Sequence, residues 1–222
     1  MVQRGLAVYK DKGYISTFNG HRVALNAATG EVVWDVVAAD YTASEAFTAM
    51  DLPLKGMIIN GTVGAEYGTR LWMEARDAET GELIWKTYSV PGPGEPGNET
   101  WPGDTWKYGG GSYWVTASYD KEQDCLFWGV GNPGPDFYRG GRIGDNLWTD
   151  SVLKLDATTG KMLAGFQFSP NDPYDYDSVQ EDIIADVPIN GEMRKVIIHC
   201  NRNGYFYVLD RVMGLDDFAS WG

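Results

Sequence analysis

The sequence predicts an all-β protein built from repeated units, and three observations support this prediction. The chain of 222 residues contains 28 Gly, 13 Tyr and 9 Trp, a composition that suits short strands and tight turns more than helices. Apolar runs such as "GMIING" and "CLFWGVG" have the length of strands. A turn-like motif centred on Thr-Gly also recurs along the chain.

The recurring motif has the pattern Asx-x-x-Thr-Gly-x-x-x-aromatic. Its copies are "ALNAATGEVVW", "ARDAETGELIW" and "KLDATTGKMLAGF", followed by the weaker "VLDRVMGLDDF". Their anchors are Asn26, Asp77, Asp156 and Asp210. In each copy a strand-like segment enters a turn, where the Asx side chain binds its own backbone and Gly supplies a positive φ. A second strand then leaves with an aromatic residue that can pack on a neighbouring unit.

The spacing of the anchors indicates the architecture. Most steps are about fifty residues long, the length of a four-stranded blade of a β-propeller. A β-sandwich of unrelated hairpins is the alternative, and the repeated turn with its following Trp makes it less suitable. We therefore predict about four blades. The longer middle step carries an insertion over roughly 87–125, where Pro and Gly are expected to exclude regular structure. Long ordered loops of this kind usually have a function.

The charge and the scarce reactive residues exclude several functions. A formal net charge of −13 argues against nucleic acid or an anionic membrane as a partner. No apolar run approaches membrane-spanning length. His21 and His199 are the only histidines, so a multi-histidine metal site is excluded. Cys125 and Cys200 could pair, but the sequence does not decide this.

The segment "NDPYDYDSVQ" places two carboxylates, Asp175 and Asp177, on either side of Tyr176. If the segment is extended, residues i and i+2 point to the same side, so we expect the two carboxylates to converge and repel. A cation between them, or a proton on one of them, would relieve the repulsion. On this stretch alone, a solvated acidic loop is the better interpretation.

The turns occur together with the motifs "QRGLA", "GAEYG", "WKYGGGSYW", "GVGNPGP", "PYDYD" and "NRNGYFYVLDR". With these motifs in this order, the chain resembles the quinoprotein alcohol dehydrogenases over essentially its whole length. The resemblance implies an eight-bladed propeller that holds pyrroloquinoline quinone (PQQ) and one metal ion at its axis. The family's chains are much longer and exported. We therefore expect residues 1–222 to form a single partial propeller domain, inside a longer periplasmic protein.

The resemblance also assigns roles, motif by motif. The residues expected to bind PQQ are Arg4, Thr48, Gly64, Ala65, Ser112, Trp114 and Arg202. The residues expected to ligate the metal are Glu66, Asn132, Asp175 and Asp177. Asp175 and Arg202 are the expected catalytic residues: the first accepts the hydroxyl proton and the second stabilises the developing oxyanion.

Three positions depart from the family pattern. Val63 stands where members often have Ser, and Tyr174 stands where Trp is usual. Asp136 replaces an aromatic residue that many members have after "NPGP". We expect the change at Tyr174 to alter the alcohol pocket while keeping an aromatic wall.

Asp177 bears on the identity of the metal. Calcium-dependent members usually have a small residue at this position, and an Asp resembles the lanthanide-dependent branch. Hard cations take many oxygen ligands, and a trivalent ion is better matched by an extra carboxylate. We therefore expect a lanthanide(III) ion rather than Ca²⁺.

The resemblance implies oxidation of a small primary alcohol to an aldehyde, with electrons passed to a cytochrome c. We expect this segment alone to be inactive, and the full-length protein to form a homodimer. Two alternatives remain open: a non-catalytic propeller scaffold of the same superfamily, and a calcium-type quinoprotein for larger alcohols. The joint presence of Glu66, Asn132, Asp175 and Arg202 weighs against the scaffold.

Overall fold

The structure is a computed structural model that describes residues 2–215 and 217–221. Within these residues all the strands belong to four antiparallel sheets of four strands each. Their bounds are β1 Ala7–Tyr9, β2 Lys12–Ser16, β3 His21–Asn26 and β4 Val32–Val37; β5 Leu52–Leu54, β6 Met57–Gly61, β7 Trp72–Asp77 and β8 Leu83–Tyr88; β9 Ser118–Asp120, β10 Cys125–Val130, β11 Ser151–Asp156 and β12 Met162–Gln167; β13 Ile183–Ile189, β14 Glu192–Cys200, β15 Phe206–Asp210 and β16 Asp217–Trp221.

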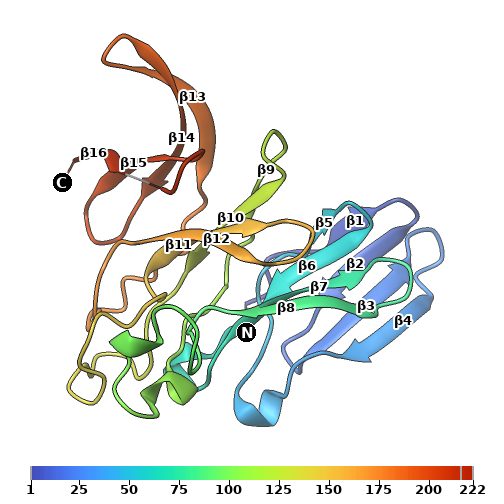
Figure 1. Cartoon of the computed structure of the whole chain (residues 1–222). Coiled ribbons are helices and arrows are strands. Elements are labelled where there is room, and N and C mark those ends of the chain that lie inside the picture. Colours follow the sequence, from blue (N-terminus) through green and yellow to red (C-terminus); the bar gives the residue numbers. More distant parts are fainter. Residues whose placement is uncertain (1, 216, 222) are drawn as a thin grey trace.

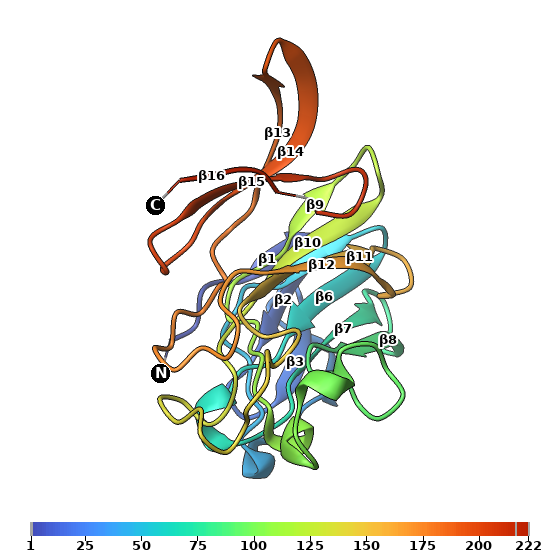
Figure 2. The same cartoon turned by 60° about the vertical axis from the view of Figure 1, so that its left-hand side comes forward.

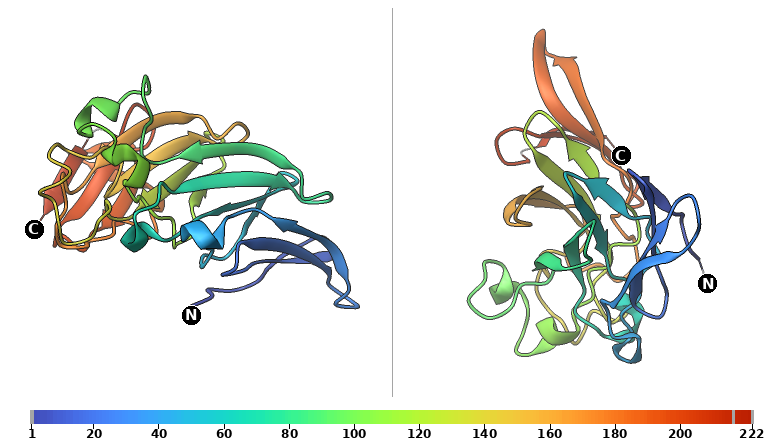
Figure 3. Two further views of the ribbon diagram at one scale, coloured as in Figure 1. Left: turned by 90° about the horizontal axis from the view of Figure 1, so that it is seen from below. Right: turned by 90° about the vertical axis from the view of Figure 1, so that its right-hand side faces the viewer.

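The four sheets follow one another in chain order, from the blue β1–β4 sheet to the red β13–β16 sheet (Figures 1 and 3). Inside each sheet, neighbours in space are neighbours in sequence. The first strands meet one another, with β1 against β5 and β9 against β13. The sheets are therefore four consecutive blades of a propeller, arranged with their first strands inward, and the predicted fold class is confirmed.

The strand order sorts the connections onto two ends of the blades. Every sheet is antiparallel, so its strands run alternately in opposite directions. The second and fourth strands of each blade therefore end on the side where the first strand begins. The long connections 38–51, 62–71, 89–117, 131–150 and 168–182 all leave from this side, which we call the loop end. The opposite side, the turn end, carries only short hairpin turns. The long loops gather at the lower part of Figure 2.

The four repeat motifs form the same turn at the turn end. In each turn, Oδ1 of the anchor Asx accepts hydrogen bonds from the backbone N–H groups two and three residues later. The donors are Ala28 and Thr29 for Asn26, Glu79 and Thr80 for Asp77, Thr158 and Thr159 for Asp156, and Val212 and Met213 for Asp210. The distances lie between 2.6 and 3.1 Å. The turns therefore join the third and fourth strands of every blade, as the sequence predicts.

Tryptophans on the fourth strands connect one blade to the next. A Cβ built on Gly81 would lie 3.0 Å from the ring of Trp34, so that ring packs directly on the bare turn of the next blade. The Trp34 indole also donates to the carbonyl of Ala78, at 3.1 Å. Trp85 packs in the same way on Gly160. Only glycine leaves room for these rings, which explains why Thr-Gly and Trp recur together.

The third blade departs from this pattern. Ala164 occupies the position on the third blade that Trp34 occupies on the first. In the turn of the fourth blade, nothing lies within 4 Å of a Cβ built on Gly214. Lys154, opposite Ala164 on β11, bridges the gap instead: its ammonium donates to the carbonyls of Arg211 and Val212 at 2.8 and 3.1 Å. Arg211 directly follows the anchor Asp210, just as Ala78 directly follows the anchor Asp77, so the two carbonyls are equivalent. The aromatic residue of the third copy, Phe166, still packs on the next blade, with its ring centroid 5.8 Å from that of Tyr207. The indole that docks on the turn is absent, and the Lys154 ammonium binds the corresponding carbonyl.

The core lies between the blades, in separate clusters. Leu126 and Trp128 face the cluster shared with the second blade, whereas Cys125 and Phe127 face the cluster shared with the fourth. Since both faces of an internal blade are buried, its strands read as continuous apolar runs rather than alternating ones. Cys125 is buried and Cys200 is exposed, and both are free, so the disulfide left open by the sequence does not form.

The insertion in the chain occupies the connection 89–117. It contains two short 3₁₀ helices, η3 Asn98–Thr100 and η4 Thr105–Tyr108. The expected absence of regular structure is therefore wrong for these two turns. The other 3₁₀ helices are η1 Tyr41–Ala43 and η2 Ala65–Tyr67, both also at the loop end. Among the described residues, no helix is long and apolar enough to cross a membrane.

We expect Lys154→Ala to lower the free energy of unfolding by about 2 kcal/mol, because charge-assisted hydrogen bonds are lost and two carbonyls are left unpaired. Adding Ala164→Trp should recover part of the loss, because the indole can reach the vacated turn. Urea unfolding curves measure both effects. Lys161→Ala, an exposed lysine of the same blade, is the control. A double variant no more stable than Lys154→Ala would contradict the equivalence of the two bridges.

Candidate functional site

All the predicted site residues lie at the loop end, although they come from every blade. Thr48, Ser112, Trp114 and the two aspartates lie in connections between blades. The remaining ones lie before β1 or between the second and third strands of a blade. The antiparallel order brings these two kinds of connection to one side, so residues separated by up to two hundred positions come together.

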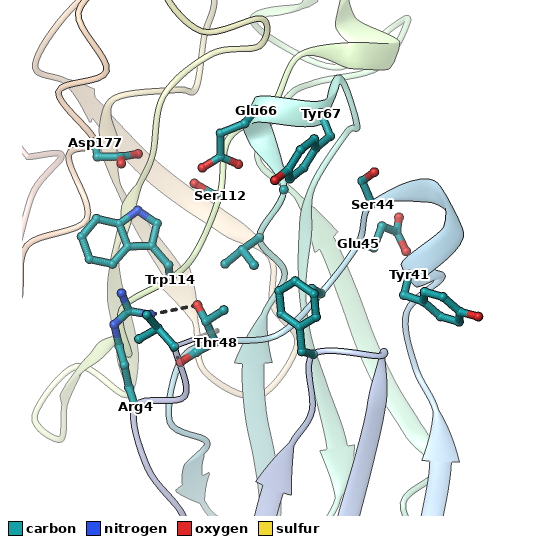
Figure 4. Close-up of a pocket in the computed structure, with 15 residues that line it drawn as sticks. Arg4, Tyr41, Ser44, Glu45, Thr48, Glu66, Tyr67, Ser112, Trp114 and Asp177 are labelled. Carbon is teal, nitrogen blue, oxygen red and sulfur yellow. Dashed lines mark hydrogen bonds between the residues drawn. The ribbon is translucent and has the colours of Figure 1, made fainter.

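One cavity of about 600 Å³ collects most of them (Figure 4). Its lining includes the predicted residues Arg4, Thr48, Gly64, Glu66, Ser112, Trp114 and Asp177. Ala65 is buried in η2 beside Gly64, and Asn132, Asp175 and Arg202 lie at the edge, in contact with Asp177 or its neighbours. A volume of this size falls in the range of ligand-binding cavities.

Glycines allow the loops to approach closely beneath this cavity. Gly64 has φ +132, and a side chain there would collide with the carbonyl of Ser44. A Cβ on Gly131 would collide with Ser112 Oγ and lie 2.5 Å from Asp177 Oδ1. The absence of a side chain at residue 131 therefore lets Ser112 and Asp177 meet from different loops.

Arg4, Thr48 and Trp114 form one wall (Figure 4). Arg4 Nη1 donates to Thr48 Oγ1 at 2.9 Å, and the backbone of Arg4 donates to the Thr48 carbonyl at 3.1 Å. The guanidinium lies 4.8 Å from the centroid of the Trp114 ring, in cation–π contact. This wall offers a fixed cation, a hydroxyl and a flat aromatic surface, the features that suit a planar anionic ligand.

Asp175 and Asp177 meet, but not for the expected reason. Their φ angles are +60° and +50°, in the left-handed region, so the segment is not extended and the extended-strand expectation is wrong. The two carboxyl groups nevertheless lie close enough that the charge of Asp175 adds to burial in raising the pKa of Asp177. Arg202 Nη1 lies 3.9 Å from Asp177 Oδ2, which supplies the nearby cation that their repulsion calls for. The prediction of two converging carboxylates is therefore right in outcome.

The acidic group is larger than predicted. Asn132 donates from its backbone to Asp177 Oδ1 at 3.1 Å and from its amide to Asp136. Asp136, in turn, is close enough to feel the charges of Asp175 and Glu66. Asp136, which replaces the aromatic residue of the family pattern, therefore belongs to the same acidic group.

The pKa values of Asp136, Asp175 and Asp177 are raised. Burial is the largest cause in each case. Burial and the charge of Asp175 raise the pKa of Asp177 to about 7. Burial with the charges of Asp175 and Glu66 raises the pKa of Asp136 to about 6. Burial also raises the pKa of Asp175, although Arg202 opposes the shift. Carboxyls perturbed by burial and by one another are typical of functional sites.

The oxygen atoms at this edge fit a hard cation by their chemistry. Glu66, Asp136, Asp175 and Asp177 carry carboxylates, and Asn132 carries an amide oxygen. A bound cation would offset the burial and the mutual repulsion that raise the pKa values of Asp136, Asp175 and Asp177. Over residues 2–215 and 217–221, however, no three His, Cys, Asp or Glu side chains already share a common ligand position. The donor set is present, and its side chains would have to turn toward a common point to bind an ion.

Sequence reasoning missed several residues of the site. Tyr41, Ser44 and Glu45 line the cavity near η1, and no pattern in the sequence marks them. Asp172 and Arg142 support the acidic loop from behind. The dipeptide Asp172-Pro173 is a turn signal that could have drawn attention to the first of these.

Comparisons with known proteins agree with this arrangement. A family model described as "Glucose/ethanol/alcohol dehydrogenase, beta-propeller domain" of the PQQ type matches residues 58–216. The chain therefore belongs to the PQQ-dependent alcohol dehydrogenase propeller family.

Individual relatives are similar over nearly the whole chain. The quinohemoprotein alcohol dehydrogenase ADH IIB of Pseudomonas putida is 39% identical, over 96% of this chain and 33% of the relative. A lanthanide-dependent methanol dehydrogenase of Methylacidiphilum fumariolicum (strain SolV) is 36% identical, over 96% of this chain and 38% of the relative. The crystal structure of the quinohemoprotein alcohol dehydrogenase of Comamonas testosteroni superposes with a TM-score of 0.93, at 38% identity, over 100% of this chain and 35% of that one. The chain thus spans about a third of the length of these relatives.

We expect the cation-free protein to lose stability as the pH rises from about 4 to about 7. A carboxyl group whose folded-state pKa is raised keeps its proton over a range in which the unfolded chain has released it, so the free energy of unfolding falls with pH there. Asp177→Asn should flatten this slope, measured by thermal unfolding in chelator. Asp156→Asn is the control, because the pKa of Asp156 is lowered and its effect lies below pH 4. An unchanged slope in Asp177→Asn would contradict the assignment.

Proposed function

We propose that this chain forms a single partial propeller domain of a PQQ- and metal-dependent alcohol dehydrogenase, which oxidises a small primary alcohol to the aldehyde. The observation that carries the proposal is the convergence of two unlike sets of residues on one cavity. An Arg4–Thr48–Trp114 wall suits a flat anionic cofactor, and an acidic edge around Asp175 and Asp177 suits a cation. Membership in the family supplies the cofactor class.

The wall would hold the cofactor. Arg4 and Thr48 would contact its carboxylates, with backbone contacts from Gly64 and Ala65, and Trp114 would stack against its plane. Ser112, buried beside Asp177, would contact its edge. Because these groups already contact one another, little side-chain entropy would be lost when the cofactor binds.

The acidic edge would hold the cation and move the proton. Glu66, Asn132, Asp175 and Asp177 would supply oxygen ligands. Asp175 would take the hydroxyl proton of the alcohol, in its ionised form, which the cation and Arg202 favour. Arg202, 3.9 Å from Asp177, would offset negative charge that develops at the reacting oxygens. When bound, the quinone takes up the two electrons and the carbon-bound hydrogen that the alcohol loses, and the cation polarises the quinone carbonyl.

The proposal extends to the metal and the partners. Three carboxylates, with a fourth at Asp136, favour a lanthanide(III) ion over Ca²⁺. The similar lanthanide-dependent methanol dehydrogenase supports this choice, although other relatives of comparable identity carry no such name. We further propose a periplasmic protein with a cytochrome c as electron acceptor, by analogy with quinohemoprotein relatives.

A second candidate is a calcium-type quinoprotein that acts on larger alcohols. Tyr174, exposed at the site loop in place of the usual Trp, gives this alternative some support, because it changes the wall next to the reacting alcohol. The choice between the two depends on the metal.

We expect Asp175→Asn to reduce kcat by about 10²–10⁴-fold, the usual contribution of a general base. The experiment reconstitutes the full-length protein with PQQ and La³⁺ or Ca²⁺, and follows dye reduction by methanol and ethanol. Asp104→Asn, an exposed aspartate of the insertion, is the control. If the wild-type protein binds no PQQ with either metal, the proposed function is wrong, and the alternative of a non-catalytic propeller scaffold is left.

We expect Asp177→Ala to weaken La³⁺ binding more than Ca²⁺ binding, because a trivalent ion gains more from each carboxylate. Competition titrations with both ions measure the ratio of the affinities. Equal losses for La³⁺ and Ca²⁺ would remove the lanthanide preference and leave the calcium-type candidate.

A further inference from the structure

Asp172 is buried behind the loop that carries the two converging aspartates, with only 2% of its surface exposed. Both of its carboxylate oxygens are used. Oδ1 accepts the backbone N–H of Tyr174 and Oδ2 accepts that of Tyr176, each at 2.8 Å. Asp175 lies between these two residues, so one carboxylate holds the backbone on both sides of it.

This double contact accounts for the unusual backbone of the loop. Asp175 and Asp177 both have a positive φ, a conformation that is disfavoured for residues other than glycine. The two hydrogen bonds accepted by Asp172 offset part of that cost. The loop therefore winds around Asp172, and the winding turns the side chains of Asp175 and Asp177 toward each other.

Arg142 fixes Asp172 in turn. Its guanidinium is 1% exposed and donates from Nη2 to the Asp172 carbonyl at 2.6 Å and from Nη1 to Asn146 at 2.9 Å. The amide of Asn171 donates back to the carbonyls of Arg142 and Gly144, at 2.8 and 2.7 Å. Arg142 belongs to the connection 131–150, which also carries Asn132. The contact thus joins the loop that holds the expected amide ligand to the loop that holds the expected carboxylate ligands.

An ordinary turn cap is the alternative explanation, and the chain provides an example for comparison. Asp156 accepts the backbone N–H groups of Thr158 and Thr159 through a single oxygen, on an exposed turn at the other end of the blade. Asp172 differs because it is buried, uses both oxygens and is itself held by a buried arginine. A cap that only ended a strand would require none of these features.

We propose that Asp172, held by Arg142, is a positioning residue that sets the geometry of Asp175 and Asp177 for cation binding. The inference rests on the function proposed above. Asp172 touches neither substrate nor cation. Its effect is that the backbone carrying the two aspartates is held in one arrangement, so that cation binding requires side-chain rotation but does not have to order the loop.

The test is Asp172→Asn in the full-length protein, with Asp156→Asn as the matched control. The amide keeps the shape of the side chain but has only one acceptor oxygen, so one of the two loop N–H groups loses its partner. Cation affinity is measured by Tb³⁺ luminescence sensitised by neighbouring aromatic residues. We expect a loss of about 10–100-fold in affinity for Asp172→Asn, the usual effect of residues that orient metal ligands, and no loss for Asp156→Asn.

Activity provides the second readout. With limiting La³⁺, kcat of Asp172→Asn should fall, and excess La³⁺ should restore it, whereas excess La³⁺ should not restore Asp175→Asn. Arg142→Met should reproduce the loss of Tb³⁺ affinity more weakly. Wild-type Tb³⁺ affinity in Asp172→Asn, or equal losses in both Asn variants, would overturn the positioning role while leaving the proposed function intact. No cation binding by the wild-type protein would overturn both.

Discussion

The antiparallel order of four strands in each blade is the constraint on which the site depends. That order sends the connections between the second and third strands, and those between blades, to the same end. All the predicted site residues can therefore lie at one end, while the other end keeps short turns that hold the blades together. The contacts between blades and the proposed site lie at opposite ends of the same strands. Loops at the loop end are free to vary without disturbing the packing of the blades.

The blade contacts show how much of the fold is visible in the sequence. The Thr-Gly turn and the Trp eight residues after its anchor predict both the hairpins and the way in which Trp34 and Trp85 dock on the next blade. The Lys154 contact at the third interface was not predictable, because the sequence shows only that Ala164 stands where Trp34 and Trp85 stand in the other copies. The replacement, Lys154, stands on a different strand, and its partners are backbone carbonyls, which leave no trace in the sequence.

The site is a similar mixture. A resemblance of motifs found about half of the residues that line the cavity, but it could not give the reason why Asp175 and Asp177 approach each other. The alternation rule for extended strands suggested the right pair with the wrong backbone, because the left-handed turns at both positions depend on Asp172 and Arg142. The contact of Arg142 joins segments thirty residues apart, which local pattern cannot reveal, whereas the contacts of Asp172 with Tyr174 and Tyr176 are local. The sequence showed that Asp136 departs from the family pattern, but only the fold shows that the amide of Asn132 donates to it.

The acidic edge and its support act in opposite directions on the stability of the chain. Three carboxyl groups with raised pKa values destabilise the cation-free protein at neutral pH, because each must either remain protonated or repel its neighbours. The buried hydrogen bonds of Asp172 and Arg142 resist the rearrangement that would relieve this repulsion. A loop without that support could separate its carboxylates and would then have to reassemble them around each incoming ion. The repulsion among the carboxyl groups and the suitability of the site for a cation therefore have the same structural cause.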